Sequence, residues 1–338
     1  MQAISLTHFL TKHLQHAKQD PIAAMVGDIA AAVKQITIAI DKGALAGNMG
    51  NLASENVQGE TQKALDMITN DIFVDCVQKS GYVDGMVSEE IELPIEMAAK
   101  YRGRGGYLLM FDPLDGSSNV NVNISVGTIF SILKTPQGKK SGQHPDLDDF
   151  LQAGTNQVCA GYALYGTSTM LVFTTGDGVN GFTLDAENGE FYLTHPSMQI
   201  PKETLEFAVN MSNYRFWQSP IQRYVDECLV GIEGEREKDF NMRWVASMVA
   251  EVHRILVRGG VFLYPVDTKN QSGKLRLMYE ANPMSFIVEQ AGGAATTGLL
   301  PIMEVEPTNI HQRVSVILGS KTEVDLIASY HSVKKKKR

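Results

Sequence analysis

The residues of this sequence best suited to metal chemistry lie in the segment Phe111-Asp-Pro-Leu-Asp-Gly-Ser-Ser118. An apolar run leads into Asp112, a proline bends the chain, and Asp115 follows three residues later, so both carboxylates can face one point. Hard divalent cations such as Mg²⁺ bind carboxylate, carbonyl and water oxygens. The two aspartates and the carbonyl of Leu114 therefore make a suitable bridging metal site.

The end of the same segment suits a phosphate group. Gly116 allows backbone N–H groups to approach an anion closely, and Ser117 and Ser118 add hydroxyl groups. If a helical turn begins here, its free N–H groups and the positive end of its dipole favour a phosphate oxygen. A turn in which the aspartates only cap backbone groups would show the same residues, so the segment alone leaves both interpretations open.

Further acidic residues lie upstream of this segment. Glu89 and Glu90 follow the strand-like exit Gly85-Met-Val-Ser88, and adjacent like charges are unfavourable unless they are solvated or share a cation. Asp66 lies on a predicted helix with Glu60 before it, and a carboxylate beside a metal-bound water can accept its proton. Taken alone, these acids also fit an ordinary solvated surface.

Helices and strands that would position these residues can be predicted from the hydrophobic pattern. In the first part of the chain, short strands separated by Gly-Asp-Gly and Glu-Asn-Gly turns indicate a largely antiparallel sheet. After Pro196 and Pro201, helices alternate with strands, which indicates a second α/β unit. The predicted helices are 20–43, 59–78, 242–257 and 283–291, and the predicted strands are 107–111, 124–133, 162–165, several within 169–194, 261–264 and 314–318.

Composition restricts the function classes. The chain has 338 residues, of which 43% are apolar, and a formal charge of -8, which argues against a nucleic-acid-binding face. Without an evident membrane segment or secretory signal, a cytoplasmic location and no membrane contact are expected. Cys76, Cys159 and Cys228 are too dispersed for a disulfide framework or a zinc site, so we expect buried reduced thiols. The basic tail 334–338 is interpreted as a solvated chain end.

Taken together, these segments resemble the class I fructose-1,6-bisphosphatases, within the group of lithium-sensitive, metal-dependent phosphatases that includes inositol monophosphatases. The resemblance covers nearly the whole chain. The matching stretches are Gly59–Asp66, Val87–Glu90, Phe111–Asn119, Gly161–Gly166, Ser247–His253, Gly259–Pro265 and Lys274–Pro283.

The family's fold would be α/β, with five layers in the order αβαβα. It would consist of an N-terminal domain with the metal-site loops and regulatory-type helices, 1–195, and a sugar-phosphate-binding domain, 196–333, followed by the tail. The active site would lie between the two domains.

The resemblance implies a metal site for two or more Mg²⁺ ions per subunit, with Mn²⁺ or Zn²⁺ as substitutes. The implied ligands are Glu89, Glu90, Asp112, the Leu114 carbonyl, Asp115 and Glu280, the last from the second domain. On this hypothesis the metals bind the 1-phosphate and lower the pKa of the attacking water, and Asp66 with Glu90 accepts its proton. Glu60 would support the loop that carries this network.

The second half carries the residues that distinguish a bisphosphatase from an inositol monophosphatase. Asn210, Tyr214, Tyr264, Lys269 and Lys274 resemble the family's residues for the sugar and its second phosphate. Taken singly, Tyr264 also fits a core position, Lys269 a solvated loop and Lys274 a strand edge.

Arg243 stands where the family uses an arginine that reaches the neighbouring subunit's active site. This position implies an oligomer, commonly a homotetramer. A planar guanidinium group also suits a phosphate particularly well.

The implied activity is that of a fructose-1,6-bisphosphate 1-phosphatase, which yields fructose 6-phosphate and phosphate in gluconeogenesis or the Calvin cycle. A dual enzyme that also acts on sedoheptulose 1,7-bisphosphate is the nearest alternative, and a non-catalytic phosphate sensor is a lower one.

The sequence departs from the family's pattern in three places. Trp244 replaces a tyrosine hydroxyl expected near the 6-phosphate. Lys18–Ala23 lacks the turn found in AMP-inhibited members, and Gly106 replaces a lysine beside Tyr107, so we expect no AMP inhibition at that site. The interval 135–154 contains no cysteine, which argues against thioredoxin control there.

Overall fold

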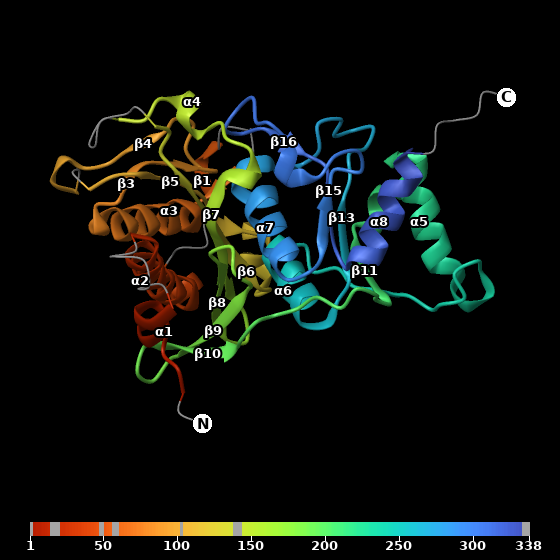
Figure 1. Ribbon diagram of the computed structural model, residues 1–338, viewed down its shortest axis with the longest axis horizontal. Coiled ribbons are helices and arrows are strands. Elements are labelled where there is room, and N and C mark those ends of the chain that lie inside the picture. The colour runs from red at the N-terminus through yellow and green to blue at the C-terminus, as the bar shows by residue number, and fades with distance from the viewer. Residues whose placement is uncertain are drawn as a thin grey trace.

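The computed structural model of the chain describes residues 3–13, 21–46, 51–55, 61–101, 104–137 and 144–332. In these residues, two β-sheets are layered with helices (Figure 1). The basic tail 334–338 and Glu60 lie outside the described residues.

The first sheet belongs to the N-terminal part of the chain and has the strand order β10-β9-β8-β7-β6-β5-β3-β4. Neighbouring strands are antiparallel except β3 and β5, which are parallel. The predicted, largely antiparallel sheet is thus confirmed. Its strands are β3 (Val83–Ser88), β4 (Ile95–Glu96), β5 (Tyr107–Asp115), β6 (Val126–Lys134), β7 (Gln157–Tyr165), β8 (Thr169–Thr174), β9 (Asn180–Asp185) and β10 (Glu190–His195).

Three helices cover the outer face of this sheet: α1 (Leu6–His13), α2 (Pro21–Lys42) and α3 (Ala64–Val77) (Figure 1). Helix α2 begins at Pro21, whose fixed φ suits the first helical position, and ends before Gly43, as predicted. By length and composition, α2 could also cross a membrane, and in the structure its apolar residues at helical spacing, such as Val26 and Ile29, are buried against the sheet.

The second sheet has the strand order β12-β11-β13-β17-β15. Its strands are β11 (Glu206–Val209), β12 (Asn241–Met242), β13 (Val261–Tyr264), β15 (Ala294–Thr296) and β17 (Val316–Gly319). Helices α5 (Ser219–Val230) and α8 (Lys321–Ser332) pack on its outer face, where Tyr224 and Ile327 join one apolar cluster with Phe207 of β11.

Helices α6 (Met248–Arg258) and α7 (Asn282–Gln290) form a middle layer between the two sheets (Figure 1). One apolar cluster contains Tyr162 of the first sheet, Val252 of α6, Ile287 of α7 and Leu318 of the second sheet. The order of layers is therefore αβαβα, and the predicted five-layer α/β fold is confirmed.

The remaining elements are short. Two-stranded sheets pair β1 (Asn51–Glu55) with β2 (Thr61–Lys63), and β14 (Leu275–Arg276) with β16 (Arg313–Val314). A short helix, α4 (Leu147–Phe150), precedes β7, and a π-helical segment, Leu277–Ala281, leads directly into α7.

Four sequence-based elements were wrong in their boundaries. The strand predicted over 314–318 is two strands in different sheets, β16 and β17, which are separated at Ser315. The helix predicted from residue 242 begins only at Met248, because Asn241–Met242 pairs with β11 and Ala246 has a left-handed backbone (φ 61°). The helix predicted over 59–78 begins at Ala64, since residues 61–63 pair with β1. The strand predicted to end before Asp112 continues to Asp115.

Candidate active site

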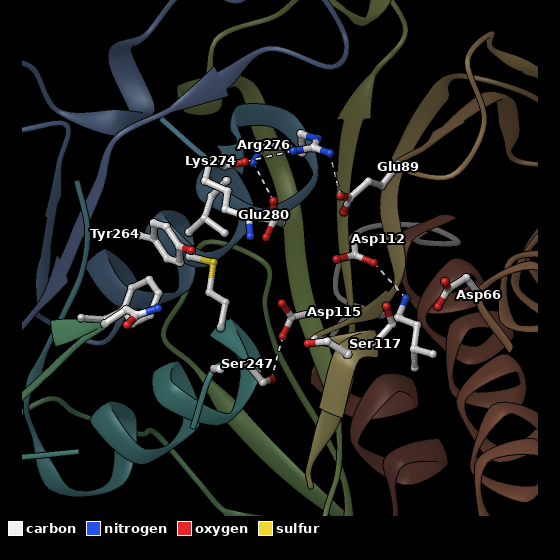
Figure 2. A pocket seen from close by; sticks show the side chains of 18 of the residues that line it. Asp66, Glu89, Asp112, Asp115, Ser117, Ser247, Tyr264, Lys274, Arg276 and Glu280 are labelled. Atoms are coloured by element: carbon white, nitrogen blue, oxygen red, sulfur yellow. Dashed lines mark hydrogen bonds and ion pairs between the residues drawn. The ribbon is translucent and has the colours of Figure 1, made fainter. Parts of the chain in front are cut away.

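A cavity of about 610 Å³ opens between the two halves of the molecule. The first half contributes acidic residues and the Gly116–Ser118 turn, and the second contributes Glu280 together with basic and aromatic residues. Figure 2 shows Glu89, Asp112, Asp115 and Glu280 around one region, with Lys274 beside Glu280 and Tyr264 at the left.

Three carboxylates form the centre of this cavity. Asp112, Asp115 and Glu280 each offer an oxygen atom, and these three atoms lie within 4.8 Å of one another. All three side chains are buried. Glu89 lines the same cavity and forms an ion pair with Arg276, at 3.4 Å.

An irregularity in strand β5 places the two aspartates. Asp112 pairs with Ile129 of β6, whereas Asp115 pairs with Gly127, so three steps along β5 correspond to two along β6. This extra residue is a β-bulge, which tolerates Pro113 inside the strand. Asp112 accepts a hydrogen bond from the Leu114 N–H through Oδ1, at 2.9 Å. The capped turn and the carboxylate cluster, which the sequence left as alternatives, therefore coexist.

The second half of the molecule holds Asp115. Its Oδ2 accepts hydrogen bonds from Ser247 Oγ, at 2.8 Å, and from the N–H of Val249, at 2.9 Å. Ser247 also caps α6, because its side chain accepts from the N–H of Ala250. The start of α6 is thus joined directly to the acidic loop.

Glu280 lies on the π-helical segment before α7, a type of segment often found at functional sites. Its Oε2 accepts a hydrogen bond from the backbone N–H of Arg276, at 2.6 Å. The Arg276 side chain is only 2% exposed, and its Nη1 donates to the carbonyl of Lys274, at 2.9 Å. Arg276 therefore places a buried positive charge between Glu280 and Glu89.

The clustered acids disfavour their own ionisation. Burial, followed by the charges of Glu89, Asp115 and Glu280, raises the pKa of Asp112 well above its usual value. Burial and the charges of Glu89 and Asp115 likewise raise the pKa of Glu280. For Asp115, burial raises the pKa and the hydrogen bonds from Val249, Ser247 and Met248 oppose it. A set of buried, mutually repelling oxygen donors fits a hard divalent cation.

Apart from Glu60, which lies outside the described residues, the structure also brings the other predicted residues of the first half to this cavity. Asp66, Glu90, Leu114, Gly116, Ser117 and Ser118 all line it. Gly116 has the left-handed φ of 75° that glycine adopts readily, and a 3₁₀ turn begins at Ser117, as expected for the phosphate turn.

An aromatic wall closes the end of the cavity opposite the acids. Trp244 stacks on Phe262, with ring centroids 6.0 Å apart and an interplanar angle of 2°, and Tyr264 packs against both rings. Asn210 and Lys274, predicted to bind substrate, line the cavity as well. The indole of Trp244 stands where the family pattern predicts a phenol.

Three predicted substrate residues do not line the cavity of the single chain. Tyr214 donates its hydroxyl to Asp226, at 2.7 Å, and the Lys269 ammonium lies over the ring of Phe216. Arg243 is 47% exposed, with Nε 4.0 Å from Glu206. Their substrate roles stay predictions.

Arg276 and Ser247 were missed as site residues by sequence reasoning. Both lie inside stretches that carry the family resemblance, yet a lone arginine in a strand and a serine before a helix carry no chemical signal of their own. Their significance follows from contacts that cross between the two halves of the chain.

A layered α/β fold with buried carboxylates beside a phosphate-type turn defines a metal-dependent phosphatase. The family model described as fructose-1-6-bisphosphatase, N-terminal domain, matches residues 4–196, and the corresponding C-terminal domain model matches residues 200–332. The chain therefore belongs to the fructose-1,6-bisphosphatase family, and it is a phosphatase.

Individual relatives agree with this assignment. The class 1 fructose-1,6-bisphosphatase of Methylobacillus flagellatus is 57% identical over 332 residues, covering 97% of this chain and 98% of the relative. That of Halorhodospira halophila is 57% identical over 312 residues, or 91% of each chain. The crystal structure of Leishmania major fructose-1,6-bisphosphatase in holo form is 38% identical, with a TM-score of 0.90, over 98% of this chain and 99% of that one.

Proposed function

We propose that this enzyme hydrolyses the 1-phosphate of fructose 1,6-bisphosphate, releasing phosphate and fructose 6-phosphate. The observation that carries the proposal is the cluster of Asp112, Asp115 and Glu280 in a cavity shared by both halves of the chain. Membership of a family whose relatives carry this name over nearly their full length supports the same substrate.

Mg²⁺ is the proposed cofactor, because the donor set consists of oxygen atoms. Asp112, Asp115, Glu280, Glu89, Glu90 and the Leu114 carbonyl would hold the ions. When bound, Mg²⁺ would lower the pKa of water and neutralise phosphoryl charge.

The side chains beside this cluster would handle the proton and the remaining charge. Asp66 and Glu90 both line the cavity, and we assign them to accept the proton of the attacking water. The buried Arg276 guanidinium would stabilise negative charge on the phosphoryl oxygens.

The opposite end of the cavity would hold the sugar and its 6-phosphate. Tyr264 offers a hydroxyl there, and the same cavity holds the Asn210 amide and the positive charge of Lys274. A bisphosphate would engage both this end and the acids, and a monophosphate only one of them, which would favour the bisphosphate.

A homotetramer is proposed because Arg243, exposed at the edge of the second sheet, would reach the cavity of a neighbouring subunit. Mixing an Asp112→Asn protein with an Arg243→Ala protein tests this. Hybrid oligomers would regain activity only if Arg243 acts across the interface, and strictly additive activities would contradict it.

The proposed reaction is tested by measuring phosphate release from fructose 1,6-bisphosphate, sedoheptulose 1,7-bisphosphate and inositol monophosphate, each with Mg²⁺, Mn²⁺, Zn²⁺ or a chelator. Asp112→Asn and Glu90→Gln should each remove most turnover while the protein stays folded. Asp177→Asn, which neutralises an exposed acid in the β8–β9 turn, is the matched control. Near-normal activity in both cavity variants would refute the site, and equal turnover of the two bisphosphates would establish the dual activity.

A further inference from the structure

The bulge between Asp112 and Asp115 leaves one residue of strand β6, Thr128, opposite two residues of β5. Thr128 is fully buried, and its Oγ1 donates a hydrogen bond to the carbonyl oxygen of Pro113, at 2.9 Å. Its hydroxyl thus replaces, at the bulge, the regular backbone pairing that the extra residue interrupts.

A second buried hydroxyl completes this contact. The Tyr165 hydroxyl on β7 lies 2.8 Å from Thr128 Oγ1. A threonine hydroxyl has one hydrogen, and the Pro113 carbonyl can only accept, so Tyr165 must be the donor to Thr128. Burial raises the pKa of Tyr165, which keeps its hydroxyl protonated and able to donate. The order of donation is therefore Tyr165 to Thr128 to Pro113.

The carbonyl held by this pair belongs to the same peptide group as the N–H of Leu114. A trans peptide is planar, with its C=O and N–H pointing in opposite directions. Thr128 holds the oxygen end of the group, and Asp112 Oδ1 accepts from the N–H end, at 2.9 Å. The orientation of the Asp112 carboxylate is thereby coupled to the Thr128 hydroxyl.

We propose that Thr128 and Tyr165 are positioning residues of the metal site: they fix the peptide between Pro113 and Leu114 and so direct the Asp112 carboxylate toward Asp115 and Glu280. They touch neither substrate nor metal, and they act through this one peptide group. The inference rests on the metal site of the proposed function, but it concerns metal binding and not the identity of the sugar.

The variants that isolate this role change one hydroxyl at a time. Thr128→Val keeps the shape of the side chain and removes the donor, whereas Thr128→Ser keeps the donor. Tyr165→Phe removes only the second hydroxyl. Thr296→Val is the matched control, because the buried Thr296 on β15 of the second sheet likewise donates its hydroxyl to a backbone carbonyl, that of Leu300, at 3.0 Å.

Binding of Mn²⁺ alone to the chelator-treated protein, measured by calorimetry and by electron paramagnetic resonance, is the primary measurement. Thr128→Val should raise the Mn²⁺ dissociation constant about ten-fold, in the range seen when partners of metal ligands are removed. Tyr165→Phe should raise it by a smaller factor, and Thr128→Ser should stay near the wild-type value. Thr296→Val should lower thermal stability with unchanged Mn²⁺ affinity.

An unchanged Mn²⁺ dissociation constant in Thr128→Val, with lowered thermal stability like that of Thr296→Val, would overturn the proposal by showing a purely structural role. If Thr128→Val does not fold, Tyr165→Phe is the test of the proposal. An unchanged Mn²⁺ dissociation constant in Tyr165→Phe would then overturn the proposal. If the wild-type protein binds Mn²⁺ but releases no phosphate, the proposed function is refuted. The comparison of Mn²⁺ affinities between wild type and the hydroxyl variants still tests the positioning role.

Discussion

Replacing Asp112 by asparagine should make the metal-free protein more stable while removing most of its activity. Oxygen atoms of Asp112, Asp115 and Glu280 lie within 4.8 Å of one another, and two unit charges at that distance repel by about 3.5 kcal/mol at an effective dielectric constant near 20. Two such neighbours would together repel a charged Asp112 by about 7 kcal/mol if all three groups were ionised. The raised pKa of Asp112 shows that bound protons relieve part of this repulsion, so we expect a gain of about 2 kcal/mol near neutral pH.

Asparagine suits this test because its amide oxygen can still accept the hydrogen bond from the Leu114 N–H. Urea unfolding of wild type and variant should be measured with a chelator and again with saturating MgCl₂. The variant should be the more stable protein in chelator, and the wild type should gain more from the metal. Asp112→Ala, which also removes the acceptor for Leu114, should gain less. If Asp112→Asn is less stable than wild type in chelator, repulsion among these carboxylates does not limit metal-free stability.

Three further changes have defined outcomes. Ser247→Ala removes the donor to Asp115 Oδ2 and the cap of α6, so it should cost about 1 kcal/mol in urea unfolding and weaken Mn²⁺ binding, whereas Ser247→Thr should restore both. Burial and the nearby His195 lower the pKa of His253 to about 4. Since the unfolded histidine binds a proton between about pH 6.5 and 4 and the folded one does not, stability should fall by about 3 kcal/mol as pH falls through this window. His253→Phe should remove that part of the pH dependence, and an unchanged slope would contradict the assignment. Trp244→Tyr adds a hydroxyl to the aromatic wall and should lower KM for fructose 1,6-bisphosphate several-fold with little change in kcat; an unchanged KM would show that this position does not contact the substrate.

Elements with a regular hydrophobic pattern were predictable from the sequence. Helix α2 has a proline start, a glycine stop and apolar residues at helical spacing, and the structure matches it closely. The start of α6 was not predictable in this way, because the residues before it are apolar enough to continue the helix. The helix starts later for two reasons. Asn241–Met242 pairs with β11, and Ala246 has a left-handed backbone that a helix does not allow.

For the site, residue type indicated the chemistry, whereas tertiary contacts determined the arrangement. Asp112 and Asp115 could be selected from their spacing, and Glu280 entered only through the family resemblance, because a lone glutamate has no local signal. The bulge at Pro113 was not predicted, since it depends on the register with β6. Arg276 is recognised only when its contact with Glu89, from the other half of the chain, is seen.

The shared middle layer has a consequence for how such a gene can be divided. Two family models meet near residue 200, yet α6 and α7, both encoded after that point, cover the inner face of the first sheet. A first half expressed alone would present Ile129, Tyr162 and Val172 to solvent, a bare apolar surface prone to aggregation. It would also lack Glu280. Each half therefore depends on the other for burial and for the metal site, and a split or recombined gene would lose solubility and metal affinity together.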